Sequence, residues 1–156
     1  IITTTAPATA SGTASIGWGL PAAIGAKLAD PARDVICVTG DGGFGYAINE
    51  LETAARYKVN LLVVVFNNAT LGFQRHWEEK ALGRVMDCDF LDVDYSEVSR
   101  ALKGGGERVT DPQHLAAAIA RGKKFPGPYV IDAIIDPEAA APIVGFDKPI
   151  VEGAYH

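Results

Sequence analysis

Hydrophobic residues in this chain follow two patterns that alternate along the sequence: continuous apolar runs and helical spacing. Segments 34–39, 61–66 and 129–135 are nearly continuous apolar runs bounded by polar or turn-forming residues. This pattern is typical of strands that are buried on both faces of a sheet. We therefore predict three core strands, and the short segment Glu107–Val109 is a candidate for a fourth.

Helical spacing marks the segments between these strands. Residues 46–58 place apolar side chains three and four positions apart, with polar residues opposite. Pro21 and Pro112 each suit the first turn of a helix, and the run Gly104–Gly106 ends one. The predicted helices are 20–29, 46–58, 70–81, 96–102 and 112–124, and the predicted irregular segments are 1–19, 83–94 and 137–156.

The order of these elements predicts the fold class. Strands that alternate with helices over short connections imply right-handed crossovers and a parallel sheet. We predict one three-layer α/β/α domain with a mostly parallel sheet over residues 1–156. The chain begins at Ile1 rather than Met, so we expect it to be a fragment or a processed part of something longer.

Composition narrows the functional classes. The 156 residues are 48% hydrophobic and 21% charged, with a net charge of −5 and no basic run, which argues against nucleic-acid binding. No segment reaches the roughly 18 apolar residues of a membrane span. Cys37 and Cys88 lack the spacing of a disulfide framework or a zinc site, which suits a reducing cytoplasm. We therefore expect a cytoplasmic protein.

A glycine-rich turn, Gly40-Asp41-Gly42-Gly43-Phe44-Gly45, follows the first core strand and precedes a helix. Glycines there let backbone N–H groups approach an anion such as a phosphate. Asp41 conflicts with this, because two like charges about 4 Å apart repel by roughly 4 kcal/mol at an effective dielectric of 20. A divalent cation between the charges removes the repulsion, so the turn predicts a metal-bridged diphosphate site.

Two other nucleotide sites fit this turn less well. It matches the dinucleotide pattern G-x-G-x-x-G, but that site has no acid beside its pyrophosphate. It also needs Asp or Glu at the end of the next strand, where this chain has Asn67-Asn68. A Walker-type loop is excluded because no Gly-Lys-Ser/Thr sequence follows.

Asp41 and Asn68 each follow a strand of the predicted sheet. Neighbouring parallel strands end side by side, at the edge where ligands bind, so the fold brings these two residues together. Their oxygens, two phosphate oxygens and a water would give the octahedral shell that magnesium prefers. From spacing alone, an equally good interpretation is that Asp41 caps a helix and Asn67-Asn68 forms a turn.

The pairing of G-D-G with N-N at the end of the following strand resembles the signature of thiamine diphosphate enzymes. The chain looks like the C-terminal, diphosphate-binding domain of the acetolactate synthase-like branch, which implies thiamine diphosphate and Mg²⁺ as cofactors. The likeness covers nearly the whole chain. Further matching segments are 9–12, 16–26, 50–54, Gly72, Trp77-Glu78 and 127–132.

The resemblance implies a role for individual residues. Asp41 and Asn68 would bind Mg²⁺ through their side chains, and Thr70 through its backbone carbonyl. Ile16 takes the place of the residue that forces the cofactor into its V conformation, although an ordinary packing role for Ile16 stays open. The other cofactor contacts would be the Ala14 carbonyl, at the exocyclic amine, and the amides of Gly42, Gly43, Leu71 and Gly72, at the diphosphate.

The same resemblance implies that part of the active site lies elsewhere. Family members carry an essential glutamate on a pyrimidine-binding domain, which usually comes from a neighbouring subunit. That domain is absent from this sequence, as are the first strand and helix expected before the Thr-rich segment. We therefore expect no catalytic residue in this chain, half of a cofactor site, and no activity from the chain alone.

Residues 73–76, Phe-Gln-Arg-His, depart from the sequence usual in acetolactate synthases. Phe73 and Gln74 fall where the family lines its substrate pocket, and Gln74 is polar where a small apolar residue is usual. Gln74 would hydrogen-bond a more oxygenated substrate, or it points to solvent; the two interpretations are equally good. His76 is expected to be a packing or surface residue rather than an acid–base group.

The leading functional expectation is a thiamine diphosphate- and Mg²⁺-dependent enzyme that makes or breaks a C–C bond next to a carbonyl. Decarboxylation of a 2-oxo acid with acyl transfer is the first choice. The alternatives are a simple 2-oxo acid decarboxylase, a C–C hydrolase or lyase, and a non-catalytic diphosphate-binding paralogue. The resemblance implies a homodimer or homotetramer and leaves room for FAD in the full-length protein.

Overall fold

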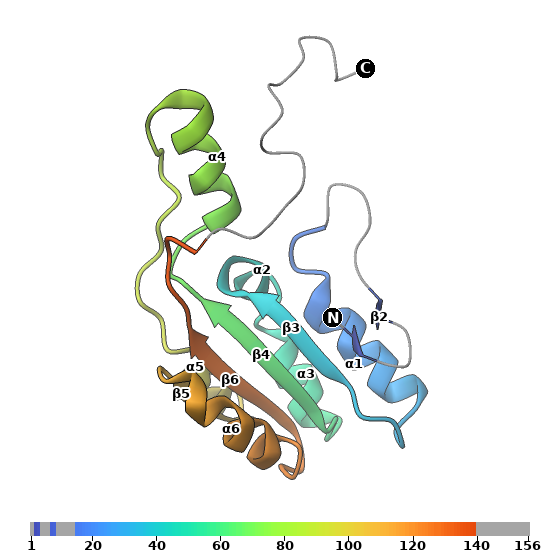
Figure 1. Cartoon of the computed structure of the whole chain (residues 1–156). Coiled ribbons are helices and arrows are strands. Elements are labelled where there is room, and N and C mark those ends of the chain that lie inside the picture. The colour runs from blue at the N-terminus through green and yellow to red at the C-terminus, as the bar shows by residue number, and fades with distance from the viewer. Residues whose placement is uncertain (1, 4–6, 9–14, 140–156) are drawn as a thin grey trace, which may run out of the picture.

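The computed structural model describes residues 2–3, 7–8 and 15–139. Its described part contains a sheet of four parallel strands in the order β3-β4-β6-β5 (Figure 1). Three of the strands occupy the predicted apolar runs, and the fourth extends the candidate strand by two residues. The strands are β3 (Ile36–Gly40), β4 (Leu61–Asn67), β5 (Gly105–Val109) and β6 (Pro128–Ile134).

Helices cover both faces of this sheet, which confirms the predicted three-layer α/β/α fold. Helices α1 (Gly19–Ala29), α3 (Glu50–Arg56) and α5 (Tyr95–Ala101) contribute to one apolar cluster, and α6 (Leu115–Gly122) packs on the opposite face. The remaining elements are α2 (Asp41–Gly45), α4 (Gly72–Leu82), the 3₁₀ turn η1 (Pro112–His114) and the two-residue strands β1 (Ile2–Thr3) and β2 (Pro7–Ala8).

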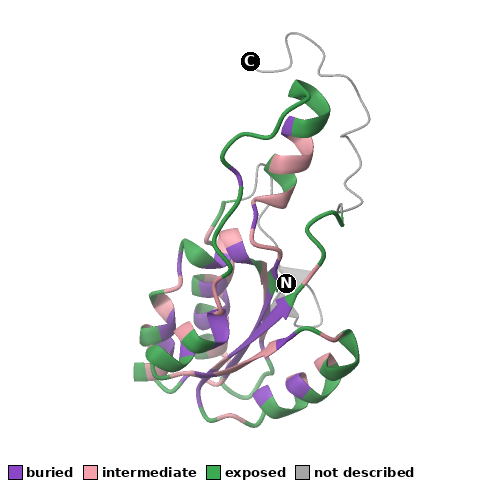
Figure 2. Cartoon of the chain, turned by 90° about the vertical axis from the view of Figure 1, so that its left-hand side faces the viewer, coloured by how far each residue is buried: buried purple, intermediate pink, exposed green. Residues whose placement is uncertain are grey.

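Strand β4 is the centre of the core. Its residues Leu61–Val65 are all buried, and they alternate between the two apolar clusters. Leu61, Val63 and Val65 face α1 and α3, whereas Leu62 and Val64 face α6. A strand that buries both faces needs an unbroken apolar run, which explains why this segment shows no alternation in the sequence. Figure 2 shows the buried strands inside the layers and the largely uncovered α4.

The structure corrects several predicted boundaries. Residues 46–49 form turns, so the helix predicted from residue 46 begins at Glu50. Helix α5 ends at Ala101, before the glycine run expected to end it, and Gly105 and Gly106 are the first two residues of β5. A Cβ at Gly106 would lie 2.7 Å from the Val130 carbonyl oxygen, so glycine is required there by close packing against β6. The predicted irregular N-terminal segment contains the antiparallel pair β1-β2.

The glycine-rich segment is a short helix, α2, rather than an open turn. Gly40 before it is extended, and among the described glycines only Gly17 and Gly83 have a positive φ. Gly42 and Gly43 of α2 therefore permit close approach rather than unusual backbone angles, whereas a Cβ at Gly45 would have no atom within 4 Å. A Cβ at Gly42 would lie 2.7 Å from a methyl carbon of Leu71, and one at Gly43 would lie 3.1 Å from Thr39 Oγ1.

Candidate functional site

Asp41 and Asn68 lie at one edge of the sheet, as the sequence predicted. β3 and β4 are hydrogen-bonded in parallel with Gly40 opposite Phe66. Asp41 follows the first of these strands and Asn68 follows the second within two residues of that pair. The parallel register thus carries two residues that are distant in sequence to the same C-terminal edge.

Asp41 is a buried carboxylate with one unsatisfied oxygen. Asp41 is 3% exposed, and its Oδ1 accepts a hydrogen bond from the backbone N–H of Gly42 at 2.8 Å. Its Oδ2 is buried without a hydrogen-bond partner in the described part of the chain. Burial raises the pKa of Asp41, while the nearby backbone amides of Gly42, Ala69 and Asn68 oppose that rise. A buried oxygen of this kind is costly unless a cation or donor satisfies it.

The two asparagines after β4 have different environments. Asn67 is buried, and its Nδ2 donates to Asp132 Oδ1 at 2.9 Å and to the Val93 carbonyl at 3.0 Å. Its Oδ1 accepts from Ala69 N at 3.1 Å. Asn68 is half-buried, and its Oδ1 makes only a long bond, 3.4 Å, from Thr70 N. Of the two asparagines, Asn68 therefore has the side-chain oxygen with the weaker hydrogen bond, and its role as a metal ligand stays a prediction.

A turn with unusual backbone geometry carries Asn68. Ala69 has φ +54°, the left-handed conformation that non-glycine residues adopt rarely. The Asn67 side chain holds this turn by bonding the Ala69 amide. Such strain persists only where the surroundings fix it, and it is common at functional sites.

Thr70 is fixed by the segment that follows α4. Thr70 is 3% exposed, and its Oγ1 donates to the Cys88 carbonyl at 3.2 Å. Phe90 N donates to the Ala69 carbonyl at 2.7 Å, and Thr70 pairs with Asp89 as an isolated antiparallel bridge. The Thr70 hydroxyl is thus engaged within the chain, and a contact between the Thr70 backbone carbonyl and a metal stays a prediction.

Two of the four amides predicted to face a diphosphate are engaged inside the chain. Leu71 N donates to the Cys88 carbonyl at 2.9 Å, and Gly42 N donates to Asp41 Oδ1. Each of these two amides already has an acceptor within the described residues, and its contact with a diphosphate stays a prediction. No local pattern in the sequence predicts that residue 88 pairs with residue 71. Gly43 and Gly72 remain, near the starts of α2 and α4, where amides lack acceptors within their helix.

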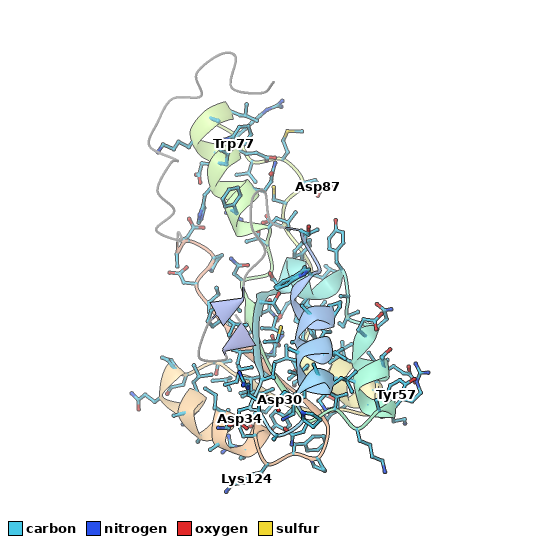
Figure 3. All side chains as sticks on the ribbon, turned by 90° about the vertical axis from the view of Figure 1, so that its right-hand side faces the viewer. Asp30, Asp34, Tyr57, Trp77, Asp87 and Lys124 are labelled. Atoms are coloured by element: carbon cyan, nitrogen blue, oxygen red, sulfur yellow. The ribbon has the colours of Figure 1, made fainter. Side chains whose placement is uncertain are left out.

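Helix α4 extends beyond the carboxyl ends of the strands and away from the sheet (Figure 1). Figure 3 shows Trp77 of α4 at one end of the molecule and Asp30 and Asp34 at the other. Gln74 of this helix is exposed, and its Nε2 donates to Glu78 Oε1 at 2.6 Å. Gln74 is thus solvent-exposed with its Nε2 engaged by Glu78, and whether Gln74 meets substrate stays a prediction.

Glu78 is a buried carboxylate that sequence reasoning did not assign a role. It is 5% exposed, and its Oε2 accepts from Met86 N at 2.7 Å. Hydrogen bonds from Gln74 and Met86 lower the pKa of this carboxyl. Glu78 thereby ties α4 to the segment whose residues 88–90 hold Thr70.

The remaining predicted residues have mixed outcomes. Ile16 is 51% exposed, so its side chain is accessible to a ligand, and Phe73 is 61% exposed. Ala14 lies outside the described residues. His76 Nε2 lies 3.2 Å from the Pro137 carbonyl, which agrees with the expected packing role.

A cavity of about 320 Å³ lies next to residues 67–70, here called the asparagine turn, and is also lined by residues at the ends of β6 and β5. Arg108, Asp92 and Thr110 contribute its polar lining, and Ile134 and Ile135 contribute apolar lining. Sequence reasoning missed Arg108 and its partner Asp132. The available signal was an aspartate inside the otherwise apolar run 129–135.

The described residues contain no group of three His, Cys, Asp or Glu side chains able to hold a metal. A metal at Asp41 would therefore rely on amide and carbonyl oxygens and on oxygens of a ligand. Among the described helices, none is long and apolar enough to cross a membrane.

Comparison with known proteins identifies the class to which this arrangement belongs. A family model described as "Thiamine pyrophosphate enzyme, C-terminal TPP binding domain" matches residues 3–133. The chain belongs to this family, and the resemblance stated from the sequence is confirmed.

Individual relatives agree with this assignment. The chain is 34% identical over 135 residues to a probable acetolactate synthase large subunit of Methanococcus aeolicus and 35% identical over 126 residues to an acetolactate synthase of Bacillus subtilis (strain 168). These alignments cover 85% and 81% of this chain but 22% of each relative. The chain thus spans less than a quarter of their length.

A solved structure shares the fold. It is the thiamine diphosphate-dependent 4-hydroxybenzoylformate decarboxylase of Rhodococcus jostii RHA1, with a TM-score of 0.71 and 30% identity. The match covers 78% of this chain and 23% of that protein.

Proposed function

We propose that this chain forms the diphosphate- and magnesium-binding half of the active site of a thiamine diphosphate-dependent enzyme. The enzyme makes or breaks a C–C bond next to a carbonyl. The observation that carries the proposal is the buried Asp41, whose Oδ2 has no partner among the described residues and which lies beside Asn68 at the ligand-binding edge of the sheet. Membership of the thiamine pyrophosphate enzyme family supports it.

The available ligands suit magnesium. Asp41 Oδ2, Asn68 Oδ1 and the Thr70 carbonyl are hard oxygen donors, the type that Mg²⁺ prefers. The cation would offset the repulsion between Asp41 and a diphosphate and satisfy the unpaired oxygen. The amides of Gly43 and Gly72 are the candidates to hold the diphosphate.

Thiamine diphosphate, when bound, supplies a thiazolium that stabilises a carbanion equivalent. This chain's own contribution is to bind and orient. The exposed Ile16 is the candidate to set the angle between the two rings, and the Ala14 carbonyl is the candidate acceptor for the exocyclic amine. We propose that the proton-relaying glutamate belongs to a pyrimidine-binding domain of a neighbouring subunit in a homodimer or homotetramer.

For the reaction, we propose decarboxylation of a 2-oxo acid followed by transfer of the acyl unit to a second carbonyl compound. The similarity to two proteins named as acetolactate synthases supports this choice. The structural similarity to a decarboxylase supports simple release of an aldehyde as the second candidate. The two outcomes differ in whether the acyl unit is transferred or protonated.

Product analysis distinguishes these candidates. The full-length protein, supplied with thiamine diphosphate, Mg²⁺ and a panel of 2-oxo acids, should yield a C–C coupled product that NMR identifies. Free aldehyde alone would replace the first candidate with the second. Gln74→Val should shift the preference among 2-oxo acids if Gln74 meets substrate, and an unaltered profile would assign Gln74 solely to its bond with Glu78.

A further inference from the structure

A network of hydrogen bonds around the ion pair of Asp132 and Arg108 contacts the asparagine turn through Asn67. Asp132, in the middle of β6, is 0% exposed, and its register partners are Val65 of β4 and Arg108 of β5. Its Oδ2 accepts from Arg108 Nε at 2.8 Å and from Tyr95 N at 3.3 Å. Its Oδ1 accepts from Asn67 Nδ2 at 2.9 Å.

The network reaches the surface through Arg108. The Arg108 side chain is 25% exposed, and its Nη2 donates to the Val93 carbonyl at 2.7 Å and to Asp92 Oδ1 at 2.9 Å. Val93 also accepts from Asn67 Nδ2. Arg108 and Asn67 therefore donate to the same backbone carbonyl, and both also donate to Asp132.

Asn67 connects this network to the turn that carries the predicted metal ligands. Its amide donors are committed to Asp132 and Val93, which fixes the direction of its Oδ1 toward Ala69 N. That bond holds Ala69 at φ +54°, and the same turn presents Asn68 and Thr70. If the Asn67 amide rotated, the left-handed turn would lose its brace.

We propose that Asp132 and Arg108 are positioning residues for the metal site, acting through Asn67 on the turn that carries Asn68 and Thr70. This inference rests on the proposed function. Desolvation largely offsets the attraction within a buried ion pair, so orientation rather than stability is what such a network supplies best. A group hydrogen-bonded directly to a metal ligand typically changes metal affinity by about 10–100-fold when mutated, and the lower end of this range is expected for residues that act through Asn67.

The test measures the Mg²⁺ concentration that half-saturates thiamine diphosphate binding, by calorimetry on the full-length protein. Asp132→Asn retains the size of the side chain but removes the charge, and should raise this concentration by about 10-fold. Arg108→Lys retains the charge but loses the planar fork, and should raise it in the same direction. Arg108→Lys also provides the test if Asp132→Asn does not fold.

Glu107→Gln is the matched control. Glu107 is the neighbour of Arg108 on β5, its side chain is equally 25% exposed, and it bonds Arg121 and Tyr129 rather than Asn67. The Glu107→Gln variant should have a lower thermal stability than the wild type, but the same Mg²⁺ requirement. An unchanged requirement in folded Asp132→Asn or Arg108→Lys would overturn the proposal, and so would an equal increase in Glu107→Gln.

These outcomes separate this inference from the proposed function. If the wild-type protein shows no Mg²⁺-dependent binding of thiamine diphosphate, the proposed function fails and this inference fails with it. If the wild type binds and the Asp132 and Arg108 variants bind identically, only this inference is wrong.

Discussion

At the scale of single residues, neighbouring side chains at the candidate site have different roles. Asn67 is buried and uses its polar atoms to shape the backbone, whereas Asn68 leaves its oxygen nearly unused. Asp41 similarly bonds one oxygen to its own helix and leaves the other unpaired. The sequence predicted Asp41, Asn68 and Thr70 as metal ligands, and the geometry is compatible with each.

Glu78→Gln tests a second buried carboxylate, which ties α4 to the segment holding Thr70. Because hydrogen bonds lower the native pKa of Glu78, its contribution to the free energy of unfolding is fully present above the unfolded pKa of about 4.3. That contribution is lost as the pH falls through the lower native pKa. Chemical denaturation from neutral to acid pH should show wild type more stable than the variant at neutral pH, with the two curves converging in acid.

The exposed neighbour Glu79 provides the control for this experiment. Glu79→Gln should stay close to the wild type throughout the pH range. A difference between wild type and Glu78→Gln that stays constant down to the lowest pH would contradict the assigned role of the Glu78 carboxylate.

At the scale of elements, glycines decide how closely the layers approach. Gly106 of β5 packs against the Val130 carbonyl and the Ser96 backbone, with 2.7 and 3.1 Å available to a Cβ. Gly25 of α1, in contrast, has nothing within 4 Å of that position. The same substitution should therefore have opposite effects in the two elements.

Gly106→Ala should destabilise the protein by about 1–3 kcal/mol, because the added methyl group meets backbone atoms that cannot move independently. Gly25→Ala should stabilise it by about 0.5–1 kcal/mol, because alanine has the higher helix propensity. Urea denaturation measures both. Destabilisation of similar size in both variants would show that the packing around β5 is not the cause.

Some helices, strands and pairings could be predicted from the sequence, and others could not. Unbroken apolar runs predicted the core strands, because a strand that is buried on both faces of the sheet has apolar residues at successive positions. The helical character of α2 was missed because its glycine content indicates a turn. The pairing of residues 88–90 with 69–71 depends on hydrogen bonds between distant segments, which no local period encodes.

At the scale of the whole molecule, the candidate site lies at one end of the sheet. Asp41 and the asparagine turn follow β3 and β4, and α4 extends beyond them (Figure 1). The order of strands and helices was enough to predict this edge, because parallel strands share one carboxyl end. The Asp132–Arg108 network behind the turn was not predicted, since only the folded sheet brings β5 beside β6.

Calorimetry of thiamine diphosphate binding to the full-length protein, with and without Mg²⁺, tests the central claim most directly. The wild type should bind only with Mg²⁺, and Asp41→Ala should abolish that binding. Asp34→Ala is the control, because Asp34 precedes β3 at the opposite end and pairs with Lys123 at the surface; it should bind as the wild type does. Equal Mg²⁺-dependent affinity in wild type and Asp41→Ala would contradict the account.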